Sequence, residues 1–219
     1  MDALNRIKFL EDRLHRLSEI GMALSTEKNT DRLFEMILDE AKHISRADGR
    51  TLYSVTKEGN LEFEIMCNDT MNMVMGGTSG IEIPFYPVKL WIDETTPNNK
   101  NVAAYAALSG KAINIHDAYE EDGFDFEGTK NFDKKSGYRS QSFLTVPLKN
   151  HENIIIGVMQ LINARDEAGN VIYFNEEMQE QIESLASQGA VALTNKRLVE
   201  ELKTLFEAFI KLIATAIDK

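Results

Sequence analysis

The side chains that could do chemistry concentrate in one polar segment, residues 116–136. It contains seven carboxylates, which could hold a cation: Asp117, Glu120, Glu121, Asp122, Asp125, Glu127 and Asp133. Their spacing does not match the calcium-binding loop, in which acids alternate and a glycine occupies the sixth position. Three aromatic residues interrupt the acids, namely Phe124, Phe126 and Phe132. Because long loops inside a compact domain are more often functional than idle, we interpret the segment as a solvated lid with its phenylalanine rings turned inward.

Two other reactive side chains were considered, Cys67 and His116. Cys67 falls on the apolar side of an alternating strand, residues 61–67, which predicts a buried and inert thiol. His116 is the only candidate for an axial haem ligand, but a lone histidine in a polar loop is more often an ordinary surface residue. We find no Ser–His–Asp set, metal-ligand spacing, P-loop or dinucleotide fingerprint. The sequence therefore predicts no enzyme in this segment and requires no cofactor.

The bulk composition narrows the class of protein. The chain has 219 residues, a hydrophobic fraction of 43% and a formal net charge of −11. The hydrophobic fraction is typical of a globular protein, and the negative charge argues against nucleic acid as a partner. No run of 18 apolar residues and no secretory signal is found, so we expect no membrane span. A single cysteine suits a reducing compartment, and we expect a cytoplasmic α+β protein.

The elements that must position the lid are organised around a predicted hairpin. Residues 142–148 and 154–162 are two apolar runs rich in Val, Ile, Phe and Thr, joined by the polar residues 149–153. The second run is apolar at nearly every position, which predicts a strand with both faces covered. Helices would cover one face, and the lid would cover the other with room for a small molecule.

Long helices are predicted at both ends of the chain. An apolar residue recurs every three or four positions in residues 1–25: Ala3, Ile7, Leu10, Leu14, Leu17 and Leu24. A helix of some 40 residues begins after Asn175, and its later part carries a similar seam: Val191, Leu198, Leu202, Leu205, Phe209, Leu212 and Ala216. Such seams favour pairing with another helix, and Asn195 would set the register of the pair. The alternative is that both ends pack on their own domain.

This pattern divides the chain into three parts. We expect a signalling or dimerisation helix at 1–25, a domain at 26–190 and a C-terminal signalling helix at 191–219 that leads to a further output domain. Other expected elements are a helix capped by Asn29 and Thr30, strands at 51–56, 61–67, 81–85 and 112–115, and a helix at 98–109. Trp91 is expected to be a local packing anchor.

Several runs of residues carry a resemblance to a known family. In order they are DAY, DKKSGYRS, FLTVPL, IIGVMQLIN and FNEE, between Gly110 and Leu198. They resemble the GAF domains of cyclic-nucleotide phosphodiesterases and bacterial signalling proteins over residues 25–198. The resemblance implies an antiparallel sheet with helices on one face and a ligand pocket under loops on the other. The last 18 residues resemble the helix that leads from a GAF domain into an HD-type phosphohydrolase domain.

The resemblance is incomplete at a motif of cyclic-nucleotide-binding GAF domains. These carry an Asn-Lys pair, then Phe, then Asp-Glu; here Asn163 and Phe174 match, Ala164 replaces the lysine, and Met178 and Gln179 replace the acids. A supporting Lys–Asp bridge is therefore absent, and Arg165 with Glu176 or Glu177 is the pair that could replace it. Bilin attachment in this family needs a suitably placed cysteine, and Cys67 lies on an early strand instead. Methionine-sulfoxide reduction in this family uses several cysteines, and this chain has one.

The function expected from these observations is a regulatory sensor that works as a homodimer. A small ligand under the lid would shift the terminal helices and so control an output domain, such as an HD-type phosphodiesterase. The alternative is a GAF dimerisation module that binds no small molecule. The residues expected to line the pocket are Phe63, Ile113, Asp117, Ala118, Tyr119, Phe126, Phe132 and Gln160.

Overall fold

The computed structural model describes the backbone of residues 18–217. Most of the predicted N-terminal seam, from Ala3 to Leu17, lies outside the described residues. Residues 18–26 are helical, and Leu24 is buried in the main core. The last seam residue of this helix therefore packs against its own domain.

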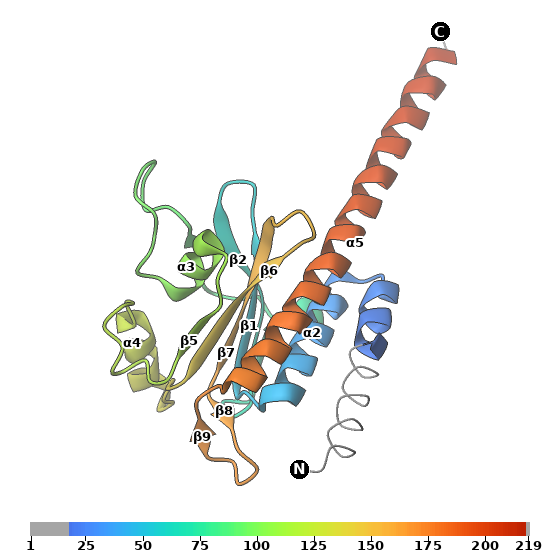
Figure 1. Cartoon of the computed structure of the whole chain (residues 1–219). Helices are drawn as coiled ribbons and strands as arrows, with labels where there is room; N and C mark the ends of the chain where they lie inside the picture. Colours follow the sequence, from blue (N-terminus) through green and yellow to red (C-terminus); the bar gives the residue numbers. More distant parts are fainter. Residues whose placement is uncertain (1–17, 218–219) are drawn as a thin grey trace.

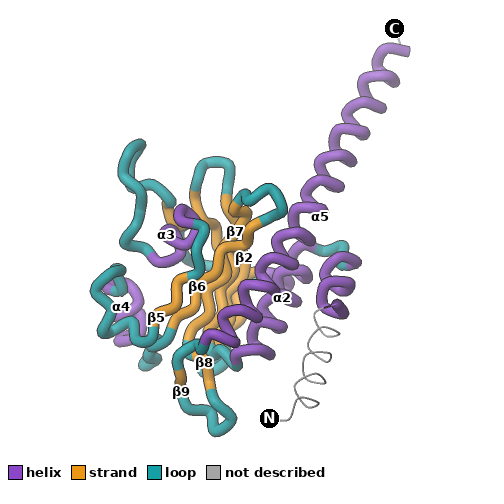
Figure 2. The backbone as a smooth tube through the Cα atoms, viewed as in Figure 1, coloured by secondary structure: helices purple, strands orange, loops and turns teal. Residues whose placement is uncertain are grey.

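A single antiparallel sheet forms the centre of the fold (Figure 1; Figure 2). Its strands follow the order β3-β2-β1-β7-β6-β5, and β4 pairs with β2 beside this path. The strands are β1 (Gly49–Val55), β2 (Asn60–Asn68), β3 (Met73–Gly76), β4 (Val88–Lys89), β5 (Ile113–Ile115), β6 (Phe143–Lys149) and β7 (Ile155–Ile162). A separate two-stranded ribbon consists of β8 (Ala164–Arg165) and β9 (Val171–Ile172). The predicted hairpin is β6–β7.

Helices α2 (Thr30–Ser45) and α5 (Glu176–Ile217) cover one face of the sheet (Figure 1). The side chain of Asn29 caps α2 by accepting a hydrogen bond from the Arg32 N–H at 3.0 Å, as the sequence predicted. The apolar stripes of both helices enter the main core with the inward residues of the strands: Leu33, Ile37, Leu52, Leu144, Met159, Leu161, Ile182 and Leu185. We call this the helix face of the sheet.

The opposite face, which we call the lid face, is covered by α3 (Val102–Ser109), α4 (Glu127–Ser136) and the loops around them (Figure 1). Two smaller apolar clusters lie here, one around Tyr53, Leu61 and Val158 and one around Ile115, Phe126 and Phe143. Val158 and Met159 are both fully buried on opposite faces of β7, which confirms that this strand is covered on both sides. The α+β antiparallel fold is as expected.

Three local predictions were wrong. The lid segment is not all loop, because α4 occupies its second half; this helix lacks an apolar stripe and is held by hydrogen bonds to the buried Asp133. Residues 81–85 form no strand, since Pro84 has no N–H to pair, and only the carbonyl of Ile81 bonds to Gly76. Trp91 is 46% exposed and therefore does not anchor the loop by burial.

The backbones of β1 and β7 approach closely at Gly157. A Cβ added there would lie 2.4 Å from the carbonyl oxygen of Tyr53. This distance is far below van der Waals contact, and the obstructing atom is main chain, so a side chain at residue 157 would force the two strands apart.

We therefore expect Gly157→Ala to destabilise the fold by about 1–3 kcal/mol, the usual cost of overpacking a core. In thermal unfolding this corresponds to a melting temperature lower by roughly 2–4 °C per kcal/mol for a chain of this size. Gly128→Ala in α4 is the matched control, because a Cβ there meets nothing within 4 Å. Equal melting temperatures for the two variants would contradict the prediction.

Candidate ligand-binding site

The eight residues predicted to line a pocket come from the elements of the lid face. Phe63 lies on β2, Ile113 on β5 and Gln160 on β7. The other five lie in the lid segment after β5: Asp117, Ala118, Tyr119, Phe126 and Phe132. The structure thus places the three strand residues and the five lid residues on one side of the sheet. That these residues contact a ligand stays a prediction.

Two of the eight are buried packing residues. Ala118 is 0% exposed and Phe126 is 5% exposed, and both belong to the apolar cluster around Phe143, whose ring centroid lies 5.1 Å from that of Phe126. Ala118 also donates its N–H to the carbonyl of Gln141 at 2.8 Å. These residues fix the first half of the lid onto the sheet.

The strand residues of the set are half-buried. The Phe63 ring packs against the rings of Tyr53 and Phe85, with centroids 4.7 and 5.8 Å away. The Gln160 side chain donates to the Thr145 hydroxyl at 3.0 Å, across the β6–β7 pair. The carbonyl oxygen of the Gln160 side chain makes no hydrogen bond within the described residues, so it could accept one from a ligand.

Asp117 and Tyr119 are held in a polar cluster with Arg139. The Asp117 carboxylate pairs with the Arg139 guanidinium at 3.0 Å and also accepts the Tyr119 N–H at 2.9 Å. The same guanidinium lies over the Tyr119 ring, 4.5 Å from its centroid, in cation–π geometry. A ligand that used Asp117 as an acceptor would therefore compete with Arg139, which sequence reasoning did not single out.

The buried carboxylate of Asp133 ties α4 to the start of β6. It accepts hydrogen bonds from the Tyr119 hydroxyl at 2.8 Å, the Ser140 N–H at 2.7 Å and the Ser140 hydroxyl at 2.9 Å. Burial and the hydrogen bond to Asp133 together raise the pKa of the Tyr119 phenol. Asp133 was expected to be one of the solvated acids; it is 3% exposed and structural.

Asn163 joins the lid to the sheet at the end of β7. Its backbone is left-handed, with φ of 57°, and its side chain is buried. The side-chain oxygen accepts the N–H groups of Gln141 at 2.8 Å and Ser142 at 3.2 Å, while the amide nitrogen donates to the Tyr138 hydroxyl at 3.0 Å and the Arg139 carbonyl at 2.7 Å. One side-chain amide thus makes four of the hydrogen bonds that hold residues 138–142 in place.

Arg165, which the sequence offered as a possible partner for Glu176 or Glu177, makes an ion pair with Asp48 at 3.0 Å. Asp48 is 3% exposed and also accepts the N–H and hydroxyl of Thr70. Burial and the nearby Asp48 carboxylate both raise the pKa of Tyr138 well above its usual value. The pair of Arg165 with Asp48 joins β8 to the residue before β1. At the positions of the missing Lys–Asp bridge, Ala164 is buried in the main core and Met178 packs against it.

The remaining candidates for chemistry are inert in the structure. Cys67 is half-buried against the main core, and burial raises the pKa of its thiol, which disfavours the reactive thiolate. His116 stacks on Tyr173, with ring centroids 4.7 Å apart. Within residues 18–217, no group of three or more His, Cys, Asp or Glu side chains is arranged to hold a metal ion. In the same part of the chain, no helix combines the length and hydropathy needed to span a membrane.

Replacing Asn163 tests its role in holding the lid. We expect Asn163→Ala to cost about 3 kcal/mol in unfolding free energy, because two buried N–H groups lose their acceptor. Asn153→Ala is the control: this exposed residue has a similar φ of 62°, so it reports the backbone strain alone, which is about 1–2 kcal/mol. Equal losses for both variants in denaturant unfolding would show that the buried hydrogen bonds contribute nothing.

Curated proteins similar to this chain include cyclic-nucleotide phosphodiesterases. The chain is 32% identical over 102 residues to the dual 3′,5′-cyclic-AMP and -GMP phosphodiesterase 11A of Takifugu rubripes, a match that covers 47% of this chain and 10% of that protein. It is 29% identical over 105 residues to the probable 3′,5′-cyclic phosphodiesterase pde-5 of Caenorhabditis elegans, covering 48% and 13%. The matches thus span only a small part of either relative.

Solved structures with the same fold include two bacterial proteins. The GAF domain of a phosphoenolpyruvate-protein phosphotransferase from Coxiella burnetii is 13% identical, with a TM-score of 0.61 over 86% of this chain and 96% of that one. The GAF domain/HD domain protein from Geobacter sulfurreducens is 14% identical, with a TM-score of 0.54 over 80% and 98%. At this identity the likeness concerns the fold alone. The family model of the GAF domain matches residues 29–193, most of the chain, and the chain therefore belongs to the GAF domain family.

Proposed function

We propose that this chain is a regulatory sensor module that binds a small ligand on the lid face and relays the binding event through paired helices to an output domain. The segment is non-catalytic, and an HD-type phosphohydrolase is the output that the C-terminal sequence favours. The main observation behind the proposal is that α5 extends beyond the domain and exposes an apolar stripe to solvent there.

The α5 helix begins in the core and continues far outside it (Figure 1). Its 42 residues span about 63 Å at 1.5 Å per residue. Ile182 and Leu185 are fully buried, whereas the seam residues Leu202 and Leu205 are 66% and 67% exposed. A single small domain cannot cover such a helix, so pairing with the α5 helix of a second copy is the arrangement that removes this surface from water.

Asn195 makes the pairing specific. It is an exposed position of the seam, three residues before Leu198. A polar amide within an otherwise apolar seam is satisfied when it faces its counterpart in a parallel pair, which fixes the register. A parallel pair also brings two output domains together at the same end, as a relay requires.

On the ligand side, the lid offers both a cover and a means of coupling. Asn163 and Asp133 connect the lid segment to β6, and β6 packs directly on α5. A ligand that binds the two lid positions unequally would shift their populations, whereas equal affinity would shift nothing. Cyclic nucleotides are the first ligands to test because the similar curated proteins act on them, even though the Lys–Asp bridge of the binding motif is replaced here.

Isothermal titration calorimetry against cyclic AMP, cyclic GMP and a metabolite panel tests the ligand proposal. We expect Gln160→Leu to weaken binding about tenfold, since it removes the free side-chain oxygen at the centre of the lid face. Gln181→Leu on α5 is the control, because this residue lies on the helix face and should leave affinity unchanged. Binding that survives Gln160→Leu would remove Gln160 from the site.

The alternative function is a dimerisation module that binds no small molecule. Two observations favour it: Ala118 and Phe126 fill the lid side with buried side chains, and Arg139 already occupies the Asp117 carboxylate. Absence of any heat across the panel, with the dimer intact, would support this alternative over the sensor.

The dimer is tested by changing the seam. Leu202→Glu with Leu205→Glu places charges in the apolar interface, so we expect a dimer of the parent protein to become a monomer in analytical ultracentrifugation. Glu207→Gln is the control, because at about 100° per residue Glu207 lies on the opposite side of α5 from these two leucines. A monomeric parent protein, or a double variant that remains a dimer, would contradict pairing through this seam.

A further inference from the structure

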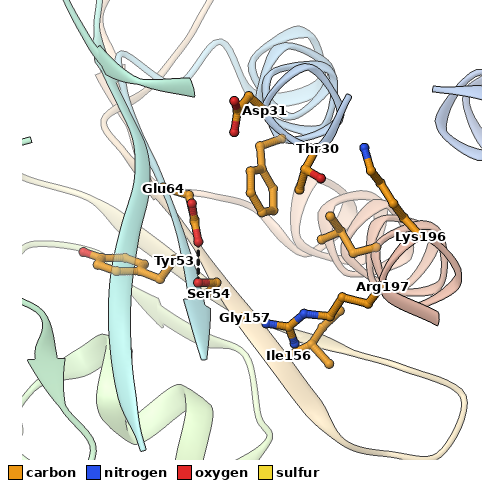
Figure 3. Close-up of a pocket in the computed structure, with 11 residues that line it drawn as sticks. Thr30, Asp31, Tyr53, Ser54, Glu64, Ile156, Gly157, Lys196 and Arg197 are labelled. Atoms are coloured by element: carbon orange, nitrogen blue, oxygen red, sulfur yellow. Dashed lines mark hydrogen bonds between the residues drawn. The ribbon is translucent and has the colours of Figure 1, made fainter. Parts of the chain in front are cut away.

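A hollow lies on the helix face of the sheet, where α5 leaves the domain (Figure 3). Its volume is about 160 Å³, and its walls come from α2, β1, β2, β7 and α5. A cavity of about 150 Å³ accommodates benzene, so this one fits a solute of roughly six to nine non-hydrogen atoms. The lining residues include Asp31, Phe34, Ser54, Glu64, Ile156, Leu193 and Arg197.

One side of the hollow is acidic. The register of the β1–β2 pair shifts between Leu52 and Tyr53, and this bulge leaves the backbone of Glu64 without an opposite residue on β1. The Ser54 hydroxyl donates to the Glu64 carboxylate, as Figure 3 shows, and Asp31 from the first turn of α2 points toward the same space. Burial raises the pKa of Glu64, and the neighbouring carboxylates of Glu62 and Asp31 add to this effect, whereas the hydrogen bond from Ser54 and the positive charge of Arg197 act in the opposite direction. Within the described residues no cation pairs with Glu64.

The other side carries a cation from α5. The Arg197 side chain extends from the helix toward Gly157 on the sheet (Figure 3). Among the described residues Arg197 makes no ion pair or hydrogen bond, whereas the neighbouring Lys196 is held by the carbonyl of Lys28. A carboxylate and a guanidinium thus line one small hollow without contacting each other.

Between the two charged sides lies an apolar wall. Phe34 and Leu193 are 5% and 8% exposed, and Ile156 is half-buried beside them. The Tyr53 ring points away from the hollow and packs against Phe63 on the lid face, so Tyr53 contributes main chain here. The hollow therefore offers one negative, one positive and one apolar surface within the size of a small metabolite.

We propose that this hollow binds a small zwitterion, an α-amino acid with an aliphatic side chain. Glu64 and Asp31 accept hydrogen bonds from its ammonium group, Arg197 pairs with its carboxylate, and the side chain packs on Phe34 and Leu193. A charge-assisted hydrogen bond at each end gives the site its preference for a molecule that carries both charges. The site shares no side chain with the lid-face set, so it stands independently of the ligand proposed there.

Such a ligand would join α2, the sheet and α5 at one point. Arg197 lies between Asn195 and Leu198, two exposed positions of the seam. Drawing Arg197 toward the sheet would fix the direction in which α5 leaves the domain. The hollow is therefore placed to make the pairing of the helices depend on the supply of an amino acid.

Calorimetric titration with L-leucine, L-valine and L-methionine tests the proposal directly. We expect at least one to bind, and the two one-charge analogues of leucine, 3-methylbutylamine and 4-methylpentanoate, each to bind at least tenfold more weakly. An analogue that binds as well as leucine would overturn the two-charge site, and so would the absence of heat with all three amino acids at millimolar concentration.

The same titrations with substituted proteins test whether the amino acid binds in this hollow. Glu64→Gln and Arg197→Gln should each weaken amino-acid binding at least tenfold, while the controls Glu58→Gln in the exposed β1–β2 turn and Lys203→Gln on α5 should leave it unchanged. Glu64→Gln is expected to keep the fold, because a neutral amide avoids the cost of a half-buried charge, and thermal unfolding checks this. Amino-acid binding that survives Glu64→Gln, or that is lost in Gln160→Leu instead, would overturn the assignment and leave the lid-face proposal untouched.

Discussion

The structure depends on the burial of β7 on both of its faces. A strand with Val158 and Met159 on opposite sides, both inaccessible to water, is stable only if an apolar layer covers each side. The amphipathic helices α2 and α5 supply one layer. The other is supplied by α3 and the lid segment, which have less apolar surface and rely on polar contacts. The two faces therefore differ in character: the helix face is a large continuous core, and the lid face is divided into smaller clusters joined by hydrogen bonds.

Polar side chains join the segments that apolar packing does not hold together. Asn163 holds the segment before β6, Asp133 holds α4, and Arg165 with Asp48 joins the β8–β9 ribbon to β1. Each is buried or half-buried, so its partner is costly to lose. Because these contacts are few and local, the lid could change its position without disturbing the core on the other face. That separation is what a sensor needs, since ligand binding must move one part of the domain while the rest stays folded.

The α5 helix belongs to the core in one half and extends beyond it in the other. Its first half is part of the core, and its second half presents apolar side chains to solvent. At the transition between these halves lie Leu193 and Arg197, which also line the hollow on the helix face. The α5 helix thus adjoins two different surfaces of the domain. It contacts the lid face indirectly, through β6, and it forms one wall of the hollow itself.

The sequence by itself determined the β6–β7 hairpin, the Asn29 cap, the strands β1 and β2 and the long C-terminal helix. These follow from periodicity and capping, which are local properties of the chain. Only the tertiary structure decided that α4 is a helix, that Asp133 is buried, and that Arg165 pairs with Asp48 rather than with Glu176 or Glu177. It also decided that Glu64 and Arg197 line the same hollow. The physical reason is that apolar periodicity encodes which side of an element is buried, whereas the partner of a polar side chain depends on distances between residues far apart in the chain.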